Sequence, residues 1–250
     1  SATKALIRQL REENPQVDVN IFRSIHDVNL KTGIGYTDLG GKYHHFLDAY
    51  EGRCGRPEYA IFDLDGTLLD SLWIWQSAAG RYLEQQGVCP PQGLADQLRG
   101  MTVPQAIAQL QDQFHLSGTV EEGVRQICAL VAQDYAERVQ LKPFARDYLD
   151  QLRRQGVPLA LATASEPAYV MPALERLGLV PYFTLIVTRD TLPLTKRQPD
   201  YYRQLAQRLG AQPQQVTVFE DSLHAIRSAK EAGCRTVAIY DASAADERSR

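Results

Sequence analysis

The sequence predicts an α/β protein with a parallel sheet and a long helical insertion. From Tyr59 onward, short β-branched and apolar runs alternate with helical patterns, which is typical of parallel strands joined by crossover helices. The strand runs are YAIFDLD (59–65), PLALATAS (158–165), TLIVT (184–188), QVTVFED (215–221) and RTVAIYD (235–241). One connection breaks this rhythm, because the chain between about 72 and 141 has helical periodicity without a convincing strand.

The connections between the later strands are predicted to be amphipathic helices. Each carries apolar residues about three and four positions apart, and three of them end at Gly. The segments are FARDYLDQLRRQG (144–156), YVMPALERLGL (169–179), PDYYRQLAQRLG (199–210) and SLHAIRSAKEAG (222–233). Such helices cover both faces of a parallel sheet, which accounts for strands that are apolar throughout.

The insertion divides the chain into predicted parts. Residues 57–71 and 142–250 are expected to form the sheet-containing core, and residues 72–141 a helical domain. Because the insertion begins directly after the first strand, it stands at the edge of the sheet where open α/β proteins bind ligands. We therefore expect it to act as a lid. Residues 1–56 fit no regular period well and are treated as an N-terminal extension of unassigned role.

Composition and charge narrow the function classes. At 250 residues and 44% hydrophobic residues the chain can bury a substantial core, and its net charge of -3 does not favour a nucleic-acid partner. Four dispersed cysteines without a CxxC pair argue against a zinc site and against a disulfide framework, so a reducing cytoplasm is expected. No apolar run approaches the roughly 20 residues of a bilayer span, and the start lacks the apolar core of a secretory signal. The first residue is Ser rather than Met, which is typical of a processed, tagged or excised chain.

Acidic residues stand at the ends of two predicted strands. Asp63 and Asp65 close the first, and Glu220 and Asp221 close the fourth. Since the carboxyl ends of parallel strands share one edge, we expect the four carboxylates to lie close together, where repulsion raises some of their pKa values. Mg²⁺ relieves such crowding, prefers oxygen ligands and usually keeps waters and a substrate phosphate. The four residues therefore predict a Mg²⁺ site and a small phosphorylated ligand.

The same strand end supplies candidates for catalysis. No Ser-His or Cys-His pairing is evident, whereas an Asp carboxylate can attack phosphorus and form an aspartyl-phosphate, so Asp63 is the candidate nucleophile. Asp65, two residues further along an extended segment, lies on the same side and is the candidate acid and base. Gly66 permits a tight turn, and Thr67 is expected to hold that turn by hydrogen bonding.

Charge that develops on the phosphate oxygens requires fixed donors. Thr163 and the backbone amide of Ala164 suit the end of the second strand. For the cation, TLPLTKRQPDYY (191–202) offers Lys196 and Arg197, of which Lys196 is the better candidate. The alternative roles are a helix cap for Thr163 and a solvent-exposed side chain for Lys196.

Four of these stretches resemble the motifs of a known family. FDLDGTLLDS (62–71), LATAS (161–165), TKRQPD (195–200) and VFEDS (218–222) stand in the order and approximate spacing of the motifs of haloacid dehalogenase-like hydrolases. The resemblance covers Tyr59 to about Asp241. It implies a Rossmann-like core, Mg²⁺ dependence and an aspartyl-phosphate intermediate, with the roles given above and with Glu220 and Asp221 positioning the metal.

The insertion resembles the C1 cap of the branch that holds β-phosphoglucomutase and phosphoglycolate phosphatase. Within it, LRGMTVPQAI (98–107) resembles the substrate-facing loop, which implies that Arg99, Gly100 and Thr102 contact the substrate. Asp65 favours phosphate-ester chemistry, because dehalogenases of the family lack this second aspartate. The prediction is a Mg²⁺-dependent phosphatase that acts on a small phosphorylated metabolite such as a sugar phosphate.

Two other functions stay open. A phosphomutase is less favoured because Val103 and Pro104 stand where mutases carry a basic residue, and SLWIWQSAAG (71–80) has no clear match for the mutase His. The second alternative is a binding or regulatory module of a larger multifunctional chain.

Motif three departs from its usual Lys-Pro-x-Pro-Asp, since Arg197 replaces the first Pro. The oligomeric state is left open by the sequence.

Overall fold

The computed structural model describes residues 35–37, 43–45 and 57–239. The chain divides into two compact units, Ser1–Arg56 and Pro57–Arg250. In the first unit, strand β1 (Gly35–Thr37) pairs antiparallel with β2 (Tyr43–His45). The rest of the predicted N-terminal extension lies outside the described residues, as does Asp241 at the end of the predicted fifth strand.

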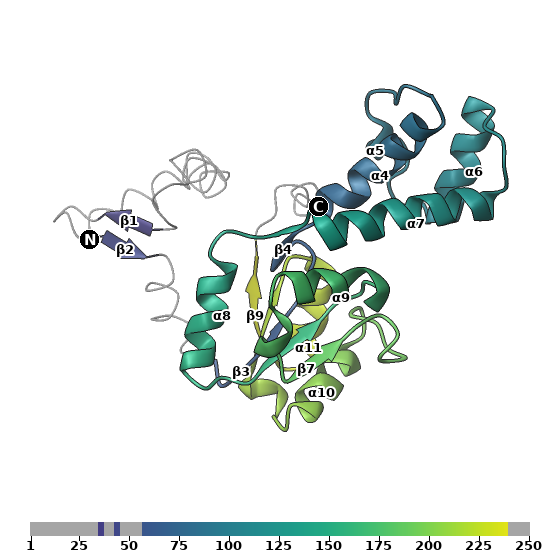
Figure 1. The fold of residues 1–250 in the computed structure, drawn as a ribbon. Coiled ribbons are helices and arrows are strands. Elements are labelled where there is room, and N and C mark those ends of the chain that lie inside the picture. The colour runs from purple at the N-terminus through teal and green to yellow at the C-terminus, as the bar shows by residue number, and fades with distance from the viewer. Residues whose placement is uncertain (1–34, 38–42, 46–56, 240–250) are drawn as a thin grey trace, which may run out of the picture. The chain divides into compact units, whose positions relative to one another are not determined.

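The second unit is built on a five-stranded parallel sheet (Figure 1). In spatial order its strands are β7 (Leu185–Val187), β6 (Leu159–Ala162), β3 (Tyr59–Phe62), β8 (Val216–Glu220) and β9 (Arg235–Ala238). The central strand β3 places Ile61 opposite Ala160 of β6 and Val218 of β8. Residues that follow β3 therefore lie between those that follow β6 and β8. The predicted α/β fold with a Rossmann-like parallel sheet is confirmed.

Helices cover both faces of the sheet. They are α8 (Ala145–Arg154), α9 (Pro167–Arg176), α10 (Pro199–Arg208) and α11 (Leu223–Glu231), with short 3₁₀ turns η1 (Val180–Tyr182) and η2 (Pro213–Gln215). Successive residues of a strand face opposite sides. Ile61 packs with the buried residues of α10 and α11, whereas Phe62 stacks on Phe219 at 4.4 Å and meets Tyr148 of α8 edge-on at 6.2 Å between ring centroids.

A short antiparallel ladder between β3 and α8 joins the two ends of the inserted helices to the core. Strand β4 (Leu69–Asp70) pairs antiparallel with β5 (Gln140–Leu141), and the Lys142 amide donates to the Leu68 carbonyl at 2.8 Å. The two connections to the intervening helices therefore lie side by side. Between them stand α4 (Leu72–Gln85), α5 (Leu94–Gln97), α6 (Val103–Phe114) and α7 (Val120–Glu137), which we call the inserted helical segment.

The inserted helices pack closely on one another. Asp134 of α7 is buried and forms ion pairs with Arg81 of α4 and with Arg138. Gly123 of α7 allows α6 to approach, because a Cβ at this position would lie only 2.6 Å from Cγ2 of Ile107. In the part of the chain that the structure describes, no helix combines the length and the hydrophobicity needed to cross a bilayer.

Candidate active site

A tight turn follows β3 and presents the motif-one aspartates at the carboxyl edge of the sheet. The Asp63 amide donates to the Phe219 carbonyl of β8 at 2.9 Å, which continues the strand pairing. Gly66 has a φ of 80°, and its amide donates to the Leu69 carbonyl at 3.0 Å. A Cβ on Gly66 would collide with the Asp221 carboxylate. Glycine is therefore required here both by the left-handed backbone and by the close approach of Asp221.

Thr67 does not hold this turn in the expected way. Its hydroxyl is buried and has no hydrogen-bond partner among the described residues. Backbone hydrogen bonds hold the turn instead, since the Leu64 carbonyl accepts from the Leu68 amide at 2.9 Å and from the Leu69 amide at 2.8 Å. The expectation failed because a compact backbone turn left the threonine side chain no polar partner.

Three carboxylates meet at this edge. Asp63, Glu220 and Asp221 offer oxygen atoms that all lie within 4.8 Å of one another. Burial and the charge of Glu220 raise the pKa of Asp63 well above its ordinary value. Burial and a hydrogen bond with Glu220 raise the pKa of Asp221 to about 7. Such a crowded all-oxygen donor set fits a hard divalent cation such as Mg²⁺.

Lys196 lies against two of these carboxylates. Its Nζ forms an ion pair with Asp63 and donates to Oε2 of Glu220 at 2.8 Å. The Lys196 side chain is only 10% exposed, so it is not a solvated surface lysine, whereas Arg197 is exposed. Burial alone would lower the pKa of Lys196, but the charges of Asp63 and Glu220 raise it well above its ordinary value. The side chain therefore stays cationic beside Asp63.

Asp65 has a different environment from its neighbour Asp63. Its Oδ1 accepts hydrogen bonds from Ser71 Oγ and from Tyr135 Oη, both at 2.6 Å. Its Oδ2 accepts from Ser165 Oγ at 2.7 Å and from Thr163 Oγ1 at 3.4 Å. Asp65 is not a member of the three-carboxylate group, although the sequence predicted four metal ligands. Hydroxyl groups from separate parts of the chain hold its side chain instead.

Thr163 and Ala164 follow β6 at the same edge. The Thr163 amide donates to the Val187 carbonyl at 2.9 Å, and its buried hydroxyl accepts from the Ser165 amide at 3.0 Å. Thr163 is not the cap of the next helix, because the residue at the N-cap of α9 is Glu166. Thr163 thus stands between β6 and Asp65, while Ala164 is exposed.

Sequence reasoning missed three of the hydroxyl groups around Asp65. Ser71 and Ser165 belong to the two stretches FDLDGTLLDS and LATAS, so their presence in these motifs was a usable signal. Tyr135 is 70 positions from Asp65, and no local pattern connects the two residues. Only the packing of α7 reveals that contact.

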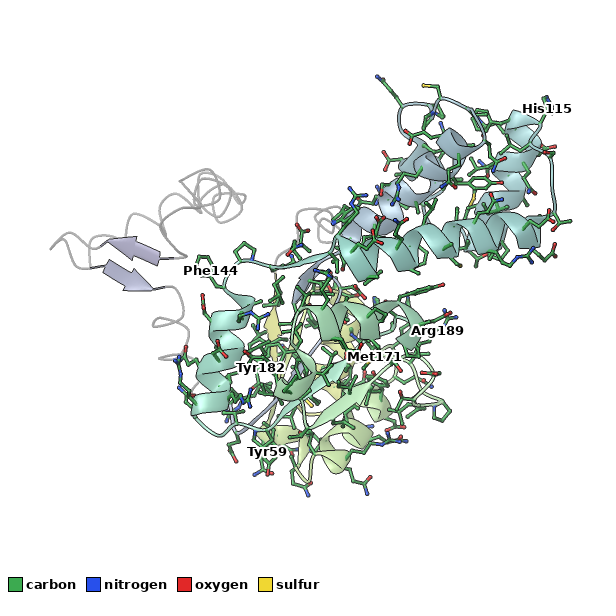
Figure 2. The ribbon with its side chains drawn as sticks, in the orientation of Figure 1. Tyr59, His115, Phe144, Met171, Tyr182 and Arg189 are labelled. Carbon is green, nitrogen blue, oxygen red and sulfur yellow. The ribbon has the colours of Figure 1, made fainter. Side chains whose placement is uncertain are left out.

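The predicted substrate loop belongs to the inserted helical segment and contacts neighbours within that segment. Arg99, Gly100 and Thr102 are exposed in the connection between α5 and α6. Arg99 forms an ion pair with Asp96, and Thr102 caps α6 through a reciprocal bond with Gln105. Figure 2 shows that His115, at the other end of α6, lies well apart from Arg189 of the core.

Known proteins with similar sequences identify the family to which the chain belongs. The family model of the haloacid dehalogenase-like hydrolases matches residues 60–239. The chain belongs to this family. A phosphoglycolate phosphatase from Pseudomonas putida is 34% identical over 193 residues, which are 73% of this chain and 69% of that protein. A phosphorylated carbohydrates phosphatase from Thermotoga maritima is 27% identical over 180 residues, 72% of this chain and 83% of that protein.

A solved structure agrees as well. CbbY from Rhodobacter sphaeroides, in complex with phosphate, is 25% identical and superposes with a TM-score of 0.57, covering 73% of this chain and 85% of that one. The resemblance drawn from the four motifs is therefore confirmed at the level of the haloacid dehalogenase-like family.

Proposed function

We propose that the chain is a Mg²⁺-dependent phosphatase that hydrolyses a small phosphorylated metabolite through an aspartyl-phosphate on Asp63. The observation that carries this proposal is the buried group of Asp63, Glu220 and Asp221 with Lys196 against it, at the carboxyl edge of the central strand. The names of the relatives, which are phosphatases of phosphoglycolate and of phosphorylated carbohydrates, support a small substrate such as a sugar phosphate.

In this proposal Asp63, Glu220 and Asp221 would hold the Mg²⁺. When bound, the ion neutralises the crowded carboxylates and polarises the substrate phosphate. Glu220 also accepts a hydrogen bond from Lys196, so its carboxylate would contact both the ammonium group and the metal ion. The carboxylate of Asp65 lies outside this group, and we assign it to proton transfer rather than to metal binding.

The chemistry then divides between the two aspartates. An oxygen of Asp63 attacks phosphorus and the P–O bond to the leaving group breaks, while Asp65 donates its proton to the departing alkoxide. Asp65, now ionised, takes a proton from the water that attacks the aspartyl-phosphate, which frees Asp63 and inorganic phosphate. Lys196, the Thr163 hydroxyl and the Ala164 amide are the proposed donors to the non-bridging oxygens.

We further propose that residues 72–141 act as a C1 cap over a core of residues 57–71 and 142–250. The β4–β5 ladder joins the two parts, which makes it the natural hinge. Arg99, Gly100 and Thr102 belong to this segment, and closure of the cap would bring them to the substrate.

A panel of phosphorylated metabolites tests the proposed function. We expect Mg²⁺-dependent release of inorganic phosphate from at least one member, and no release when a chelator removes the metal. Turnover that persists fully in the chelator would contradict the metal assignment. Transfer of phosphate back to the organic product would instead identify a phosphomutase, and complete inactivity on the panel would favour a binding module.

A further inference from the structure

Tyr135 connects the inserted helical segment to the proposed acid and base. It lies in the last turn of α7, its side chain is fully buried, and its hydroxyl donates to Oδ1 of Asp65 at 2.6 Å. The distance is that of a strong hydrogen bond between a hydroxyl and a carboxylate oxygen. An element outside the sheet thus contributes directly to the surroundings of a residue that follows the central strand.

The position of Tyr135 is fixed by the core. Nη2 of Arg176, at the end of α9, donates to the Tyr135 carbonyl at 3.3 Å and to the Val139 carbonyl at 2.5 Å. The first carbonyl belongs to the last turn of α7 and the second follows that helix directly, so the cation lies at a helix C-terminus, where it is favourable. The Tyr135 ring also stacks on Tyr169 of α9, with 6.4 Å between centroids and 22° between planes. Contacts to the backbone and to the ring of Tyr135 therefore hold its hydroxyl group in place.

The two oxygens of Asp65 are held unequally. Oδ1 accepts two short bonds at 2.6 Å, from Tyr135 and Ser71. Oδ2 accepts one short bond from Ser165 and a long contact of 3.4 Å from Thr163, the residue proposed to bind phosphate. A phosphate group that engages the Thr163 hydroxyl would release this long contact. Oδ2 is thus the less tightly held oxygen of Asp65, and it lies on the side of Thr163.

We propose that Tyr135 is a positioning residue which, with Ser71, anchors Oδ1 of Asp65 so that Oδ2 exchanges protons with the leaving group and with water. This inference rests on the proposed phosphatase function. It also implies that Asp65 has its full set of hydrogen-bond partners only when α7 is packed on α9. A carboxylate without this anchor can rotate about its side-chain torsions, and a small misplacement of a reacting group is costly.

The test is Tyr135→Phe, which keeps the ring and removes only the hydroxyl. An alkyl phosphate from the metabolite panel is compared with p-nitrophenyl phosphate, whose leaving group needs little protonation. Because kcat/KM reports steps up to release of the leaving group, a poorly placed acid lowers it for the alkyl ester only. We expect roughly a tenfold loss for the alkyl phosphate, part of the ~10²–10⁴-fold that acid–base catalysis contributes, and little change for p-nitrophenyl phosphate.

Two further variants make the result specific. Tyr82→Phe removes a hydroxyl from another buried tyrosine of the inserted segment that does not contact Asp65, and should leave both kcat/KM values unchanged. In an Asp65→Asn background, Tyr135→Phe should have no further selective effect, because the residue through which it acts is gone.

Equal losses on both substrates, no loss on either, or a selective loss that persists in the Asp65→Asn background would overturn the inference while leaving the phosphatase function intact. The wild-type protein separates the two claims, since absence of Mg²⁺-dependent phosphate release from both esters would overturn the function itself and the inference with it. Circular dichroism and the melting temperature of Tyr135→Phe show whether the variant is folded.

Discussion

At the scale of single residues, two aspartates that are two positions apart have opposite surroundings. Asp63 lies among other carboxylates and against the ammonium group of Lys196, whereas Asp65 is surrounded by hydroxyl groups. When two titratable groups of one site have different environments, they can take different chemical roles. The arrangement suits Asp63 to metal and phosphorus, and Asp65 to proton transfer.

Gly66 ties the backbone turn to the metal position, and this link gives a prediction. Gly66→Ala places a methyl group against the Asp221 carboxylate, which must then move out of the three-carboxylate group. We expect the Mg²⁺ concentration for half-maximal activity to rise at least about tenfold, because misplaced ligands and their supports typically cost 10–100-fold in metal affinity. A titration of activity against Mg²⁺ measures the change.

Gly87→Ala is the matched control for this variant. Gly87 has a φ of 77°, close to the 80° of Gly66, but a Cβ there meets nothing within 4 Å. Both variants should lose about 1–2 kcal/mol of stability from the left-handed backbone, and only Gly66→Ala should change the Mg²⁺ requirement. An equal Mg²⁺ requirement in the two variants would contradict the link between Gly66 and Asp221.

Among the helices, α7 packs both on the other inserted helices and on α9 of the core, and the two sets of contacts have different consequences. Gly123, near its N-terminal end, allows α6 to approach, and Asp134, near its C-terminal end, pairs with Arg81 of α4. At its C-terminal end it packs on α9, where Arg176 and Tyr169 hold the turn that carries Tyr135. One helix therefore fixes the shape of the inserted segment and completes the surroundings of Asp65.

The packing around Gly123 leads to a stability prediction. Alanine is the better helix former by about 1 kcal/mol, yet a Cβ at Gly123 would lie 2.6 Å from Cγ2 of Ile107 and 3.1 Å from Oη of Tyr82. We expect overpacking to prevail, so that Gly123→Ala lowers the free energy of unfolding by about 1–3 kcal/mol. Urea denaturation measures this change.

Gly80→Ala provides the comparison within the same segment. Gly80 is also inside a helix, but its Cβ would meet Pro90 at 3.6 Å, an ordinary contact. The helix propensity of alanine should then stabilise the protein by about 0.5–1 kcal/mol. If both substitutions shift the unfolding midpoint in the same direction, the expected steric conflict between a Cβ at Gly123 and α6 would be contradicted.

At the scale of the whole molecule, the sheet gathers residues that are far apart in the sequence. Strand alternation predicts that Asp63, Glu220 and Asp221 share one edge, because carboxyl ends of parallel strands must meet there. The contact of Tyr135 with Asp65 does not follow from any such rule, since it depends on how α7 docks. The position of Arg99, Gly100 and Thr102 likewise depends on the orientation of the inserted segment, which a motif does not encode.

Asp63 is proposed to carry the phosphoryl group during turnover, so the modified residue itself can be identified. The protein is mixed with Mg²⁺ and the best phosphate ester from the panel, quenched in acid during turnover, digested, and searched by mass spectrometry for a phosphoryl group. Asp63→Asn is treated in parallel, with Asp147→Asn as a control at an exposed carboxylate of α8.

We predict a phosphoryl group on Asp63 in the wild-type protein and in Asp147→Asn. Asp63→Asn should show neither the modified peptide nor phosphate release above background, because an amide cannot replace the attacking carboxylate. Its circular dichroism spectrum should match that of the wild-type protein. A phosphoryl group on another residue during turnover, or steady phosphate release by folded Asp63→Asn, would show that Asp63 is not the nucleophile.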